Sequence, residues 1–262
     1  MNQLNRPTVL ITGASSGIGK KAAYEQAIKG SNLVLVARRK DKLEEVKAIC
    51  EQLGSNSVLI HSLDISEAES IDQFISYLKQ ENVKIDVLIN NAGFGYSESF
   101  FALDFKIVSN IFQVNMIGLM YLTQQIAINM LDNGSGQIIN VASLAGKVST
   151  PKYTAYGATK GALISFSNAL RLELKEYNIQ VTVVNFGPVD TPFFEQIERS
   201  RKQMAKNSRF TLSEDQAGKI VSDTVGTKKR EVNRPLLLAA GAKFYQVFPS
   251  LGDYVMSEFI KR

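Results

Sequence analysis

The sequence predicts an α/β protein built on a doubly wound parallel sheet, and three observations support this. Short runs of Val, Ile and Leu alternate along the chain with longer segments of helical period. The apolar runs show little polar–apolar alternation, which is typical of strands covered by helices on both faces. The strand–helix alternation repeats six times, which favours a parallel sheet with helical crossovers. No repeat, low-complexity segment or linker divides residues 1–262, so we expect a single domain.

The expected strands are short and rich in Val, Ile and Leu. They are residues 8–12, 32–37, 57–61, 86–90, 136–143 and 180–186. Segments of helical period lie between them, such as 20–30 and 40–54. Gly30 and Gly54 close these two segments, and glycine commonly ends a helix because it adopts a left-handed conformation without strain.

Composition excludes several classes of protein. A chain of 262 residues with 45% hydrophobic content can bury a sizeable core. The net charge of +5, from 30 basic and 25 acidic residues, is too small and too spread out for a nucleic-acid-binding protein. The N-terminus lacks the apolar run of a signal peptide. No stretch approaches the roughly 18–20 uninterrupted apolar residues of a membrane span, so we expect none.

The chain has one cysteine and one histidine. Cys50 alone excludes an internal disulfide, so we expect a reducing compartment, the cytoplasm. His61 is the only histidine available for a serine hydrolase triad, but it lies in the apolar run SVLIHSLDIS. We interpret it as a structural residue at a strand end. We also expect no metal site, since a zinc ion would have to be bound mostly by carboxylates.

The first expected strand runs into a glycine-rich turn, TGASSGIGK. Glycine reaches positive φ and has no Cβ to hold a pyrophosphate away, and the helix that follows offers free N–H groups to phosphates. The predicted phosphate-binding residues are Gly13, Ser15, Ser16, Gly17, Ile18 and Gly19. The alternative is a plain tight turn, because a glycine trio alone is a weak signal.

The second expected strand ends in Arg38 and Arg39, with no carboxylate at its tip. A protein that prefers NAD usually places an acidic residue there, whereas arginine suits the 2′-phosphate of NADP. The sequence therefore favours NADP(H), and the alternative is a solvated basic loop. Asp64 and Ile65 end the third strand, where they could flank an adenine ring, although Asp64 could also serve as a helix N-cap.

The segment NNAG ends the fourth expected strand and contributes Asn91, Ala92 and Gly93 to the predicted cofactor site. Gly93, with Gly95 nearby, allows the backbone to approach a cofactor closely.

A tyrosine and a lysine four residues apart, Tyr156 and Lys160, follow the fifth expected strand. Residues at this spacing share one face of a helix. An ammonium beside a phenol favours the phenolate and lowers its pKa, so Tyr156 could donate a proton to a carbonyl oxygen. Ser143, at the tip of the fifth strand, could hold and polarise that oxygen. The alternative is a surface pair without a catalytic role.

Together these segments resemble the short-chain dehydrogenase/reductase family. The matching segments are TGASSGIG (12–19), LDIS (63–66), NNAG (90–93), Asn115 in FQVNMIG, Ser143 in NVASLAG, YGATK (156–160) and GPVDTPF (187–193). They span about seven-tenths of the chain in the order and spacing of the family. The resemblance implies a Rossmann-type fold with about seven strands.

The resemblance also implies roles for individual residues. Tyr156 would be the general acid–base, Ser143 would orient the substrate oxygen, and Lys160 would bind the nicotinamide ribose and lower the pKa of Tyr156. Asn115 would hold a helix kink and a water molecule that relays protons to Lys160. Val189 and Thr191 would anchor the carboxamide of the cofactor.

Two neighbouring positions are also informative. Tyr153 has no lysine four residues on, so we expect it to flank the pocket rather than to act in catalysis. Many family members read Pro-Gly after the sixth strand, where this chain has Phe186-Gly187-Pro188. Gly187 still allows a turn, and the bulkier Phe186 would alter the pocket near the nicotinamide.

The last third of the chain carries few motifs. Residues 193–212 lie where the family carries a substrate lid, and they are basic, which suits an anionic substrate, an anionic lipid surface or simply a solvated helix. The apolar extension 235–262 could lie on a membrane surface, cover the pocket or form a subunit interface. The family is usually dimeric or tetrameric, so we expect a homodimer or homotetramer. Small residues on the helix of Tyr156 would allow close helix contacts there, namely Ala155, Ala158, Gly161 and Ala162.

The sequence therefore predicts an NADPH-dependent enzyme that reduces a small-molecule carbonyl to an alcohol. Phenylalanines at 186, 193 and 194 favour a lipophilic substrate, and the basic segment favours an acyl carrier or a phosphate. One alternative is a binding protein that senses NADP(H) without catalysis. An epimerase or dehydratase on the same fold is another.

Overall fold

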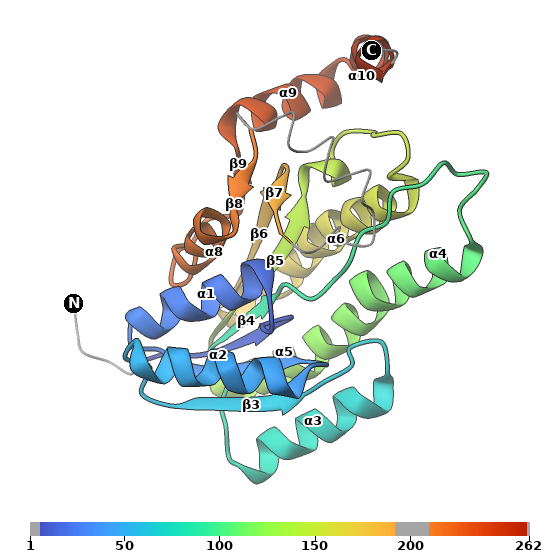
Figure 1. Cartoon of the computed structure of the whole chain (residues 1–262). Coiled ribbons are helices and arrows are strands. Elements are labelled where there is room, and N and C mark those ends of the chain that lie inside the picture. The colour runs from blue at the N-terminus through green and yellow to red at the C-terminus, as the bar shows by residue number, and fades with distance from the viewer. Residues whose placement is uncertain (1–5, 192–209, 261–262) are drawn as a thin grey trace.

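The computed structural model describes residues 6–191 and 210–260. Seven parallel strands form one sheet in the order β3-β2-β1-β4-β5-β6-β9, and helices cover both of its faces (Figure 1). The predicted doubly wound fold is therefore confirmed. The sheet strands are β1 (Thr8–Thr12), β2 (Asn32–Ala37), β3 (Val58–Ser62), β4 (Val87–Asn90), β5 (Gly136–Ser143), β6 (Ile179–Phe186) and β9 (Glu231–Arg234).

Two further strands, β7 (Val189–Asp190) and β8 (Leu212–Ser213), pair with each other outside the main sheet. They lie on either side of residues 192–209, which are outside the described part of the chain. Most of the expected lid (193–212) falls there, including its basic residues and Phe193 and Phe194.

The helices follow the strands as expected for a doubly wound sheet. They are α1 (Gly17–Ile28), α2 (Lys40–Gln52), α3 (Ala68–Gln80), α4 (Phe105–Phe112), α5 (Leu119–Asn133), α6 (Thr154–Glu173), α8 (Glu214–Ser222), α9 (Leu236–Val247) and α10 (Pro249–Ile260). Short 3-10 turns η2 (Leu144–Gly146) and η3 (Lys175–Tyr177) and a π-helical turn η1 (Gln113–Gly118) complete the described elements. Gly30 and Gly54 have φ of +76° and +109° just after α1 and α2, as predicted.

The core has two halves, one on each face of the sheet. Side chains alternate along β1, so that Val9 and Ile11 pack against α1, α2 and α8, while Leu10 packs with α3, α5 and α6. All three are fully buried. This explains why the strands are apolar throughout, since both faces of a central parallel strand meet helices.

The single cysteine and the single histidine lie outside the group of residues that line the cavity at the carboxyl edge. Cys50 is buried on α2, and burial raises the pKa of its thiol to about 12. The ring of His61, on β3, packs 5.2 Å from that of Phe74 and 4.9 Å from that of Tyr77, and burial lowers its pKa. These contacts support the structural interpretation of His61. Within residues 6–191 and 210–260, no group of three or more His, Cys, Asp or Glu side chains could hold a metal ion.

One continuous helical segment, Phe105–Asn133, is long and apolar enough to span a membrane by length and composition alone. It comprises α4, η1 and α5. Its buried side chains, such as Ile111, Leu122 and Ile126, pack into the protein core, so this segment is weak evidence for a span.

The C-terminal helices α9 and α10 extend from the carboxyl edge of the sheet, at the top of Figure 1. Leu238 of α9 lies against Gly187, whose Cβ, if present, would be 2.9 Å from Leu238 Cδ1. A hydrogen bond from the Tyr245 hydroxyl to Asp253 joins α9 to α10. Large apolar side chains are exposed on and between α9 and α10, namely Leu236, Leu237, Phe244, Val247, Phe248, Leu251, Tyr254 and Val255.

Candidate active site

A cavity of about 680 Å³ opens at the carboxyl ends of the central strands. All strands of a parallel sheet end at the same edge, so the segments after β1, β2, β4, β5 and β6 meet there. The sequence-predicted residues that line the cavity are Gly13, Ser15, Ser16, Gly17, Ile18, Arg38, Arg39, Asp64, Ile65, Asn91, Ala92, Gly93, Ser143, Tyr156, Lys160, Val189 and Thr191. Asn115 and Gly19 are the predicted site residues that do not line it.

The glycine turn fits a pyrophosphate. Gly13 and Gly17 have φ of +66° and +55°, a region that disfavours other residues. Ser16 precedes α1 without a side-chain cap, so the first N–H groups of α1 have no side-chain acceptor there. Gly19 has a different role. A Cβ on Gly19 would lie 2.5 Å from the carbonyl oxygen of Gly13, so it allows the helix to pack against the strand.

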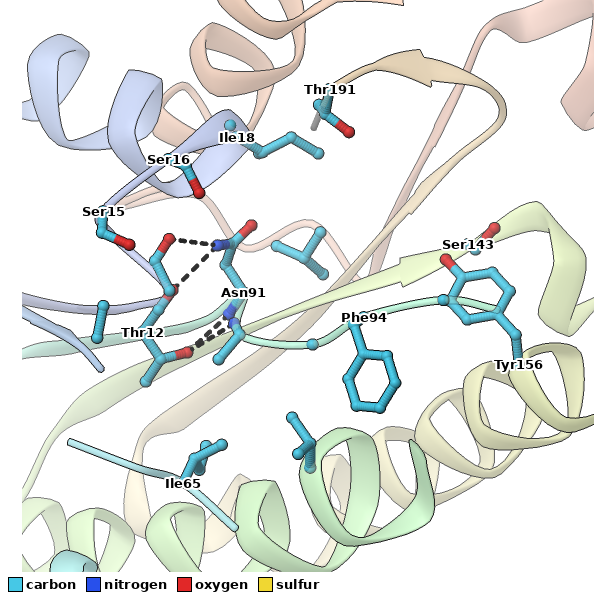
Figure 2. A pocket seen from close by; sticks show the side chains of 18 of the residues that line it. Thr12, Ser15, Ser16, Ile18, Ile65, Asn91, Phe94, Ser143, Tyr156 and Thr191 are labelled. Carbon is cyan, nitrogen blue, oxygen red and sulfur yellow. Dashed lines mark hydrogen bonds between the residues drawn. The ribbon is translucent and has the colours of Figure 1, made fainter. Parts of the chain in front are cut away.

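Thr12, which sequence reasoning missed, locks the ends of β1 and β4 together (Figure 2). Its hydroxyl accepts hydrogen bonds from the backbone N–H of Asn91 at 3.0 Å and of Ala92 at 2.9 Å. The Asn91 amide in turn donates to the Thr12 carbonyl at 3.0 Å. Asn91 thus fixes the cavity wall, in addition to lining it. A threonine directly before the first glycine of the turn is the signal that could have revealed this role.

The cationic groups at the end of β2 reach the glycine turn. Arg39 Nη2 donates to the Ser15 hydroxyl at 3.2 Å and to the Ser16 hydroxyl at 3.0 Å. Arg38 is also exposed at the cavity. Two guanidinium groups beside a phosphate-binding turn match the chemistry of a 2′-phosphate.

Asp64 is the only acidic residue among the described residues that line the cavity. Its carboxylate accepts hydrogen bonds from the Ser66 N–H at 3.0 Å and the Ser66 hydroxyl at 2.6 Å. It therefore closes the turn after β3. The N-cap of α3 is Glu67, so the alternative role of Asp64 as that cap is wrong.

Tyr156 and Lys160 share one buried face of α6. They are 8% and 5% exposed, which excludes the alternative of a surface pair. Lys160 Nζ lies 5.7 Å from the Tyr156 ring centroid and donates to the Val141 carbonyl at 3.0 Å. The Tyr156 side chain is hydrogen-bonded to Ser143. Figure 2 labels both residues, Tyr156 on α6 and Ser143 at the end of β5.

The pKa of Tyr156 shifts in the direction opposite to the one expected from its lysine. Burial raises it to about 12, and the hydrogen bond with Ser143 opposes this only in part. Burial also lowers the pKa of Lys160 to about 8. Loss of hydration disfavours the charged form of each side chain, the phenolate and the ammonium.

Ser143 is held by the backbone on two sides. Its hydroxyl donates to the Phe186 carbonyl at 3.2 Å, and it accepts from the Ala145 N–H at 3.1 Å. Tyr153 flanks Tyr156, with the two ring centroids 6.4 Å apart in an edge-on arrangement. This placement agrees with the flanking role predicted for Tyr153.

Asn115 lies in the π-helical turn η1, which is the irregularity expected of the helix at this point. Its side chain donates to the Phe94 carbonyl at 2.9 Å and accepts from the Phe94 N–H at 3.0 Å. Gly93 separates it from Lys160: a Cβ there would lie 2.9 Å from Asn115 Oδ1 and 3.8 Å from Lys160 Nζ. The space left by this glycine suits a bridging water, which stays a prediction.

Val189 and Thr191 border the cavity on the side of the glycine turn. The Thr191 side chain lies 3.7 Å from where a Cβ of Gly17 would be. After β6, Phe186 is buried, and the Gly187 N–H donates to the Arg234 carbonyl at 2.7 Å. Gly187 has no positive φ, so its importance lies in making room for Leu238 and not in turning the chain.

Several cavity residues were not predicted from the sequence. They are Thr12, Val36, Ala37, Leu63, Phe94, Tyr96, Ile107, Asn110, Val114, Val141, Ala142 and Gly187. Gly95 and Phe186 also line the cavity, where the sequence analysis expected them. Phe94, Tyr96, Ile107, Asn110 and Val114 come from the loop after β4, from α4 and from η1. Their composition follows no motif, so single-sequence reasoning had no signal for them. No residue of α9 or α10 lines the cavity, so within the described residues the extension does not cover it.

Known proteins are similar to this chain in sequence and in fold. A profile of the short chain dehydrogenase family matches residues 7–202. The chain is 36% identical over 221 residues to the NADP-dependent 3-hydroxy acid dehydrogenase of Schizosaccharomyces pombe, covering 82% of this chain and 85% of that protein. It is 34% identical over 233 residues to the 3-dehydrosphinganine reductase of Danio rerio, covering 85% and 70%.

A solved structure extends the comparison to three dimensions. The short-chain dehydrogenase from Sphingobium yanoikuyae in complex with NADPH has a TM-score of 0.80 at 28% identity, over 96% of this chain and 95% of that one. The family profile spans the glycine turn and the segment that carries Tyr156 and Lys160. The chain therefore belongs to the short-chain dehydrogenase family of oxidoreductases.

Proposed function

We propose that the chain is an NADPH-dependent reductase that converts a carbonyl group to an alcohol. The observation that carries this proposal is the buried, hydrogen-bonded pair Tyr156 and Ser143, in the same cavity as the glycine turn and Arg39. Tyr156 and Ser143 suit proton donation to an oxygen. The glycine turn and Arg39 suit the binding of a phosphorylated dinucleotide. Relatives named as an NADP-dependent dehydrogenase and as a reductase support it.

The residues present fit NADP(H). The glycine turn and the start of α1 would hold the pyrophosphate, Arg38 and Arg39 the 2′-phosphate, and Lys160 the nicotinamide ribose. NADPH bound there supplies the hydride for the carbonyl carbon.

The chain's own residues supply the proton. Because the pKa of Tyr156 is about 12, its hydroxyl is protonated at neutral pH and can act as an acid. Ser143 donates a hydrogen bond to the carbonyl oxygen and fixes its place beside the phenol. As the carbon accepts a hydride, the oxygen takes the phenolic proton and becomes the alcohol. The phenolate that remains lies near Lys160, which favours the charged form and returns the proton.

We infer a lipophilic ketone as substrate. Phe94, Ile107 and Val114 line the cavity and offer an apolar surface. Relatives named for 3-hydroxy acids and for 3-dehydrosphinganine support a substrate with an aliphatic chain next to the reacting carbon.

The decisive experiment follows NADPH consumption by its near-ultraviolet absorbance against a panel of 3-oxoacyl thioesters, steroid ketones, sugars and small diketones. Replacing Tyr156→Phe removes the proton donor and should lower kcat by about 100- to 10,000-fold, while NADPH affinity is unchanged. Tyr153→Phe is the matched control and should keep kcat within about threefold. Unchanged turnover in Tyr156→Phe would refute the mechanism. NADPH binding without reduction of any carbonyl would instead favour a sensor of the cofactor.

Cofactor choice has its own test. Arg39→Ala removes charge-assisted hydrogen bonds, which contribute about 1.5–3 kcal/mol each, so KM for NADPH should rise by at least about tenfold. KM for NADH, which has no 2′-phosphate, should change little. An equal loss with both cofactors would contradict recognition of the 2′-phosphate by Arg39.

A further inference from the structure

An ion pair outside the cavity joins the turn that follows Ser143 to the edge strand β9. Lys147, directly after η2, pairs with Glu231 of the edge strand β9, and both side chains are largely buried. Neither residue lines the cavity. We propose that Glu231 is a positioning residue that holds the Ser143 hydroxyl in place through Lys147 and Asn185. The proposal deepens the carbonyl reductase function above and rests on it.

The first connection runs through the segment that follows Ser143. Lys147 ends the 3-10 turn η2, and its N–H donates to the Leu144 carbonyl at 2.9 Å. Within that turn the Ala145 N–H donates to the Ser143 hydroxyl. On its other side the turn packs against α6, because a Cβ on Gly146 would lie 2.6 Å from the backbone of Lys160. Glu231 therefore fixes the free end of a turn that is already fixed at α6.

The second connection runs through β6. Glu231 Oε1 accepts a hydrogen bond from Asn185 Nδ2 at 2.7 Å. Asn185 is fully buried and directly precedes Phe186, whose carbonyl accepts the Ser143 hydroxyl proton. The Asn185 amide also donates to Asn233 at 2.9 Å. One carboxylate thus constrains both backbone groups that contact the Ser143 hydroxyl.

The energetic consequence of losing Glu231 follows from burial. The side chains of Lys147 and Glu231 are 13% and 28% exposed, so removing the carboxylate leaves an ammonium and an amide in a poorly hydrated place. Such uncompensated groups are strongly destabilising locally, and the segment must move to hydrate them. Exposed ion pairs contribute much less, because water screens both partners.

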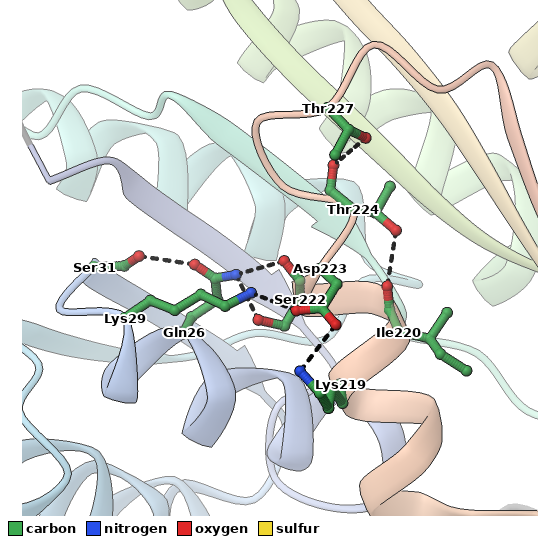
Figure 3. Close-up of polar contacts among 9 residues, drawn as sticks. All are labelled: Gln26, Lys29, Ser31, Lys219, Ile220, Ser222, Asp223, Thr224 and Thr227. Carbon is green, nitrogen blue, oxygen red and sulfur yellow. Dashed lines mark hydrogen bonds and ion pairs between the residues drawn. The ribbon is translucent and has the colours of Figure 1, made fainter. Parts of the chain in front are cut away.

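The chain offers such an exposed pair as a control. Lys29, directly after α1, and Asp223, directly after α8, form an ion pair at 2.9 Å with both side chains more than two-fifths exposed. Figure 3 shows this pair with Lys219 and with the buried hydrogen bonds of Gln26. None of these residues lines the cavity.

Position is critical for Ser143 because its single hydroxyl proton must be directed to the substrate oxygen. In the structure it is directed to the Phe186 carbonyl, which competes for it. Misplacing a reacting group by about 1 Å costs up to about 100-fold in rate. Loss of Glu231 should therefore act on kcat and not on cofactor binding, since the glycine turn and Arg39 lie elsewhere.

The experiment uses the full-length enzyme and the carbonyl it reduces fastest. Glu231→Ala should lower kcat by at least about tenfold and leave the Kd for NADPH within about twofold. Glu231→Gln keeps an acceptor for Asn185 and should recover part of the loss. Asp223→Ala should leave kcat unchanged. The critical comparison is Ser143→Ala with and without Glu231→Ala: if Glu231 acts through Ser143, the double variant has the same kcat as Ser143→Ala alone.

Three outcomes would overturn the proposal: unchanged kcat in Glu231→Ala, a further loss of equal size in the Ser143→Ala background, or a parallel loss of NADPH affinity. Amide hydrogen exchange of residues 144–147 provides a readout that needs no turnover. It should become faster in Glu231→Ala and not in Asp223→Ala, and unchanged exchange would also overturn the proposal. If the wild-type protein reduced no carbonyl, the proposed function would fall, and the exchange result alone would decide whether Glu231 holds the Ser143 turn.

Discussion

Lys160 carries its positive charge in one of the most enclosed positions of the cavity. Its pKa of about 8, against 10.5 for an exposed lysine, means that the folded protein releases this proton more readily than the unfolded chain. Between these two pH values the unfolded chain binds more protons, so the free energy of unfolding rises with pH. From pH about 8 to about 10.5, Lys160 raises the free energy of unfolding by on the order of 3 kcal/mol.

This dependence is measurable by urea unfolding of the cofactor-free protein between pH about 8 and about 10. The wild-type protein should become more stable across this range, and Lys160→Met should lose that rise. Tyr156, whose raised pKa has the opposite sign, reduces stability only above pH about 10. If the wild-type protein became less stable from pH about 8 to about 10, burial would not govern the pKa of Lys160.

For individual residues, the sequence predicted which side chains line the cavity. It did not predict how burial shifts their pKa values. Nearly every predicted cofactor residue lines the cavity, because motif spacing reports backbone positions at strand ends. The predicted direction of the Tyr156 pKa shift was wrong, because burial of the side chain, which no motif marks, raises the pKa. Ala155 is buried and Gly161 faces Gly146, so these two small residues serve the protein's own packing rather than a partner helix.

At the scale of elements, the π-helical turn η1 depends on close backbone contact. A Cβ on Gly118 would lie 1.8 Å from the carbonyl oxygen of Ile65, a residue of the cavity wall. Gly118→Ala must therefore displace either η1, with Asn115, or the turn after β3. We expect a loss of at least about 3 kcal/mol in the free energy of unfolding and weaker NADPH binding.

Gly241→Ala is the matched control for this substitution. Gly241 lies inside α9, and a Cβ there would meet nothing within 4 Å. Alanine favours a helix over glycine by up to about 1 kcal/mol, so this variant should be slightly more stable than the wild type. Denaturant unfolding of both variants tests the contrast. Equal effects would show that general helix propensity, and not contact with Ile65, governs Gly118.

Among the elements, apolar strands were readily predicted and the polar edge strand was not. Six strands lie within one residue of their expected bounds, because Val-, Ile- and Leu-rich runs are typical of strands buried on both faces. The strand β9, with the sequence EVNR, was not identified from its residues because it is short and largely polar. Its place at the sheet edge, next to β6, explains this composition.

At the scale of the whole molecule, η1 and α5 expose an apolar stripe. Ile117, Met120, Ile128 and Leu131 lie three, eight and three residues apart, which places them on one face of the helix, and each is exposed. Because such a stripe is unfavourable in water, we expect it to be covered in a homodimer or homotetramer.

Light scattering after size-exclusion chromatography tests this expectation. The wild-type mass should be two or four times that of the chain, and Met120→Glu/Ile128→Glu should lower it. Ile28→Glu is the control, since Ile28 is equally exposed but stands apart on α1. A wild-type mass of one chain would contradict association, and a change caused only by Ile28→Glu would place the interface on the other side of the molecule.

The solitary thiol of Cys50 has a practical consequence. Because no other cysteine is present and this one is buried on the inner side of α2, a thiol reagent should modify the native protein only when α2 moves away from the sheet. The rate of modification therefore reports how often Cys50 becomes accessible, and no probe has to be introduced. Slower labelling in the presence of a nucleotide would show that a ligand at the glycine turn makes opening of the neighbouring half of the core less frequent.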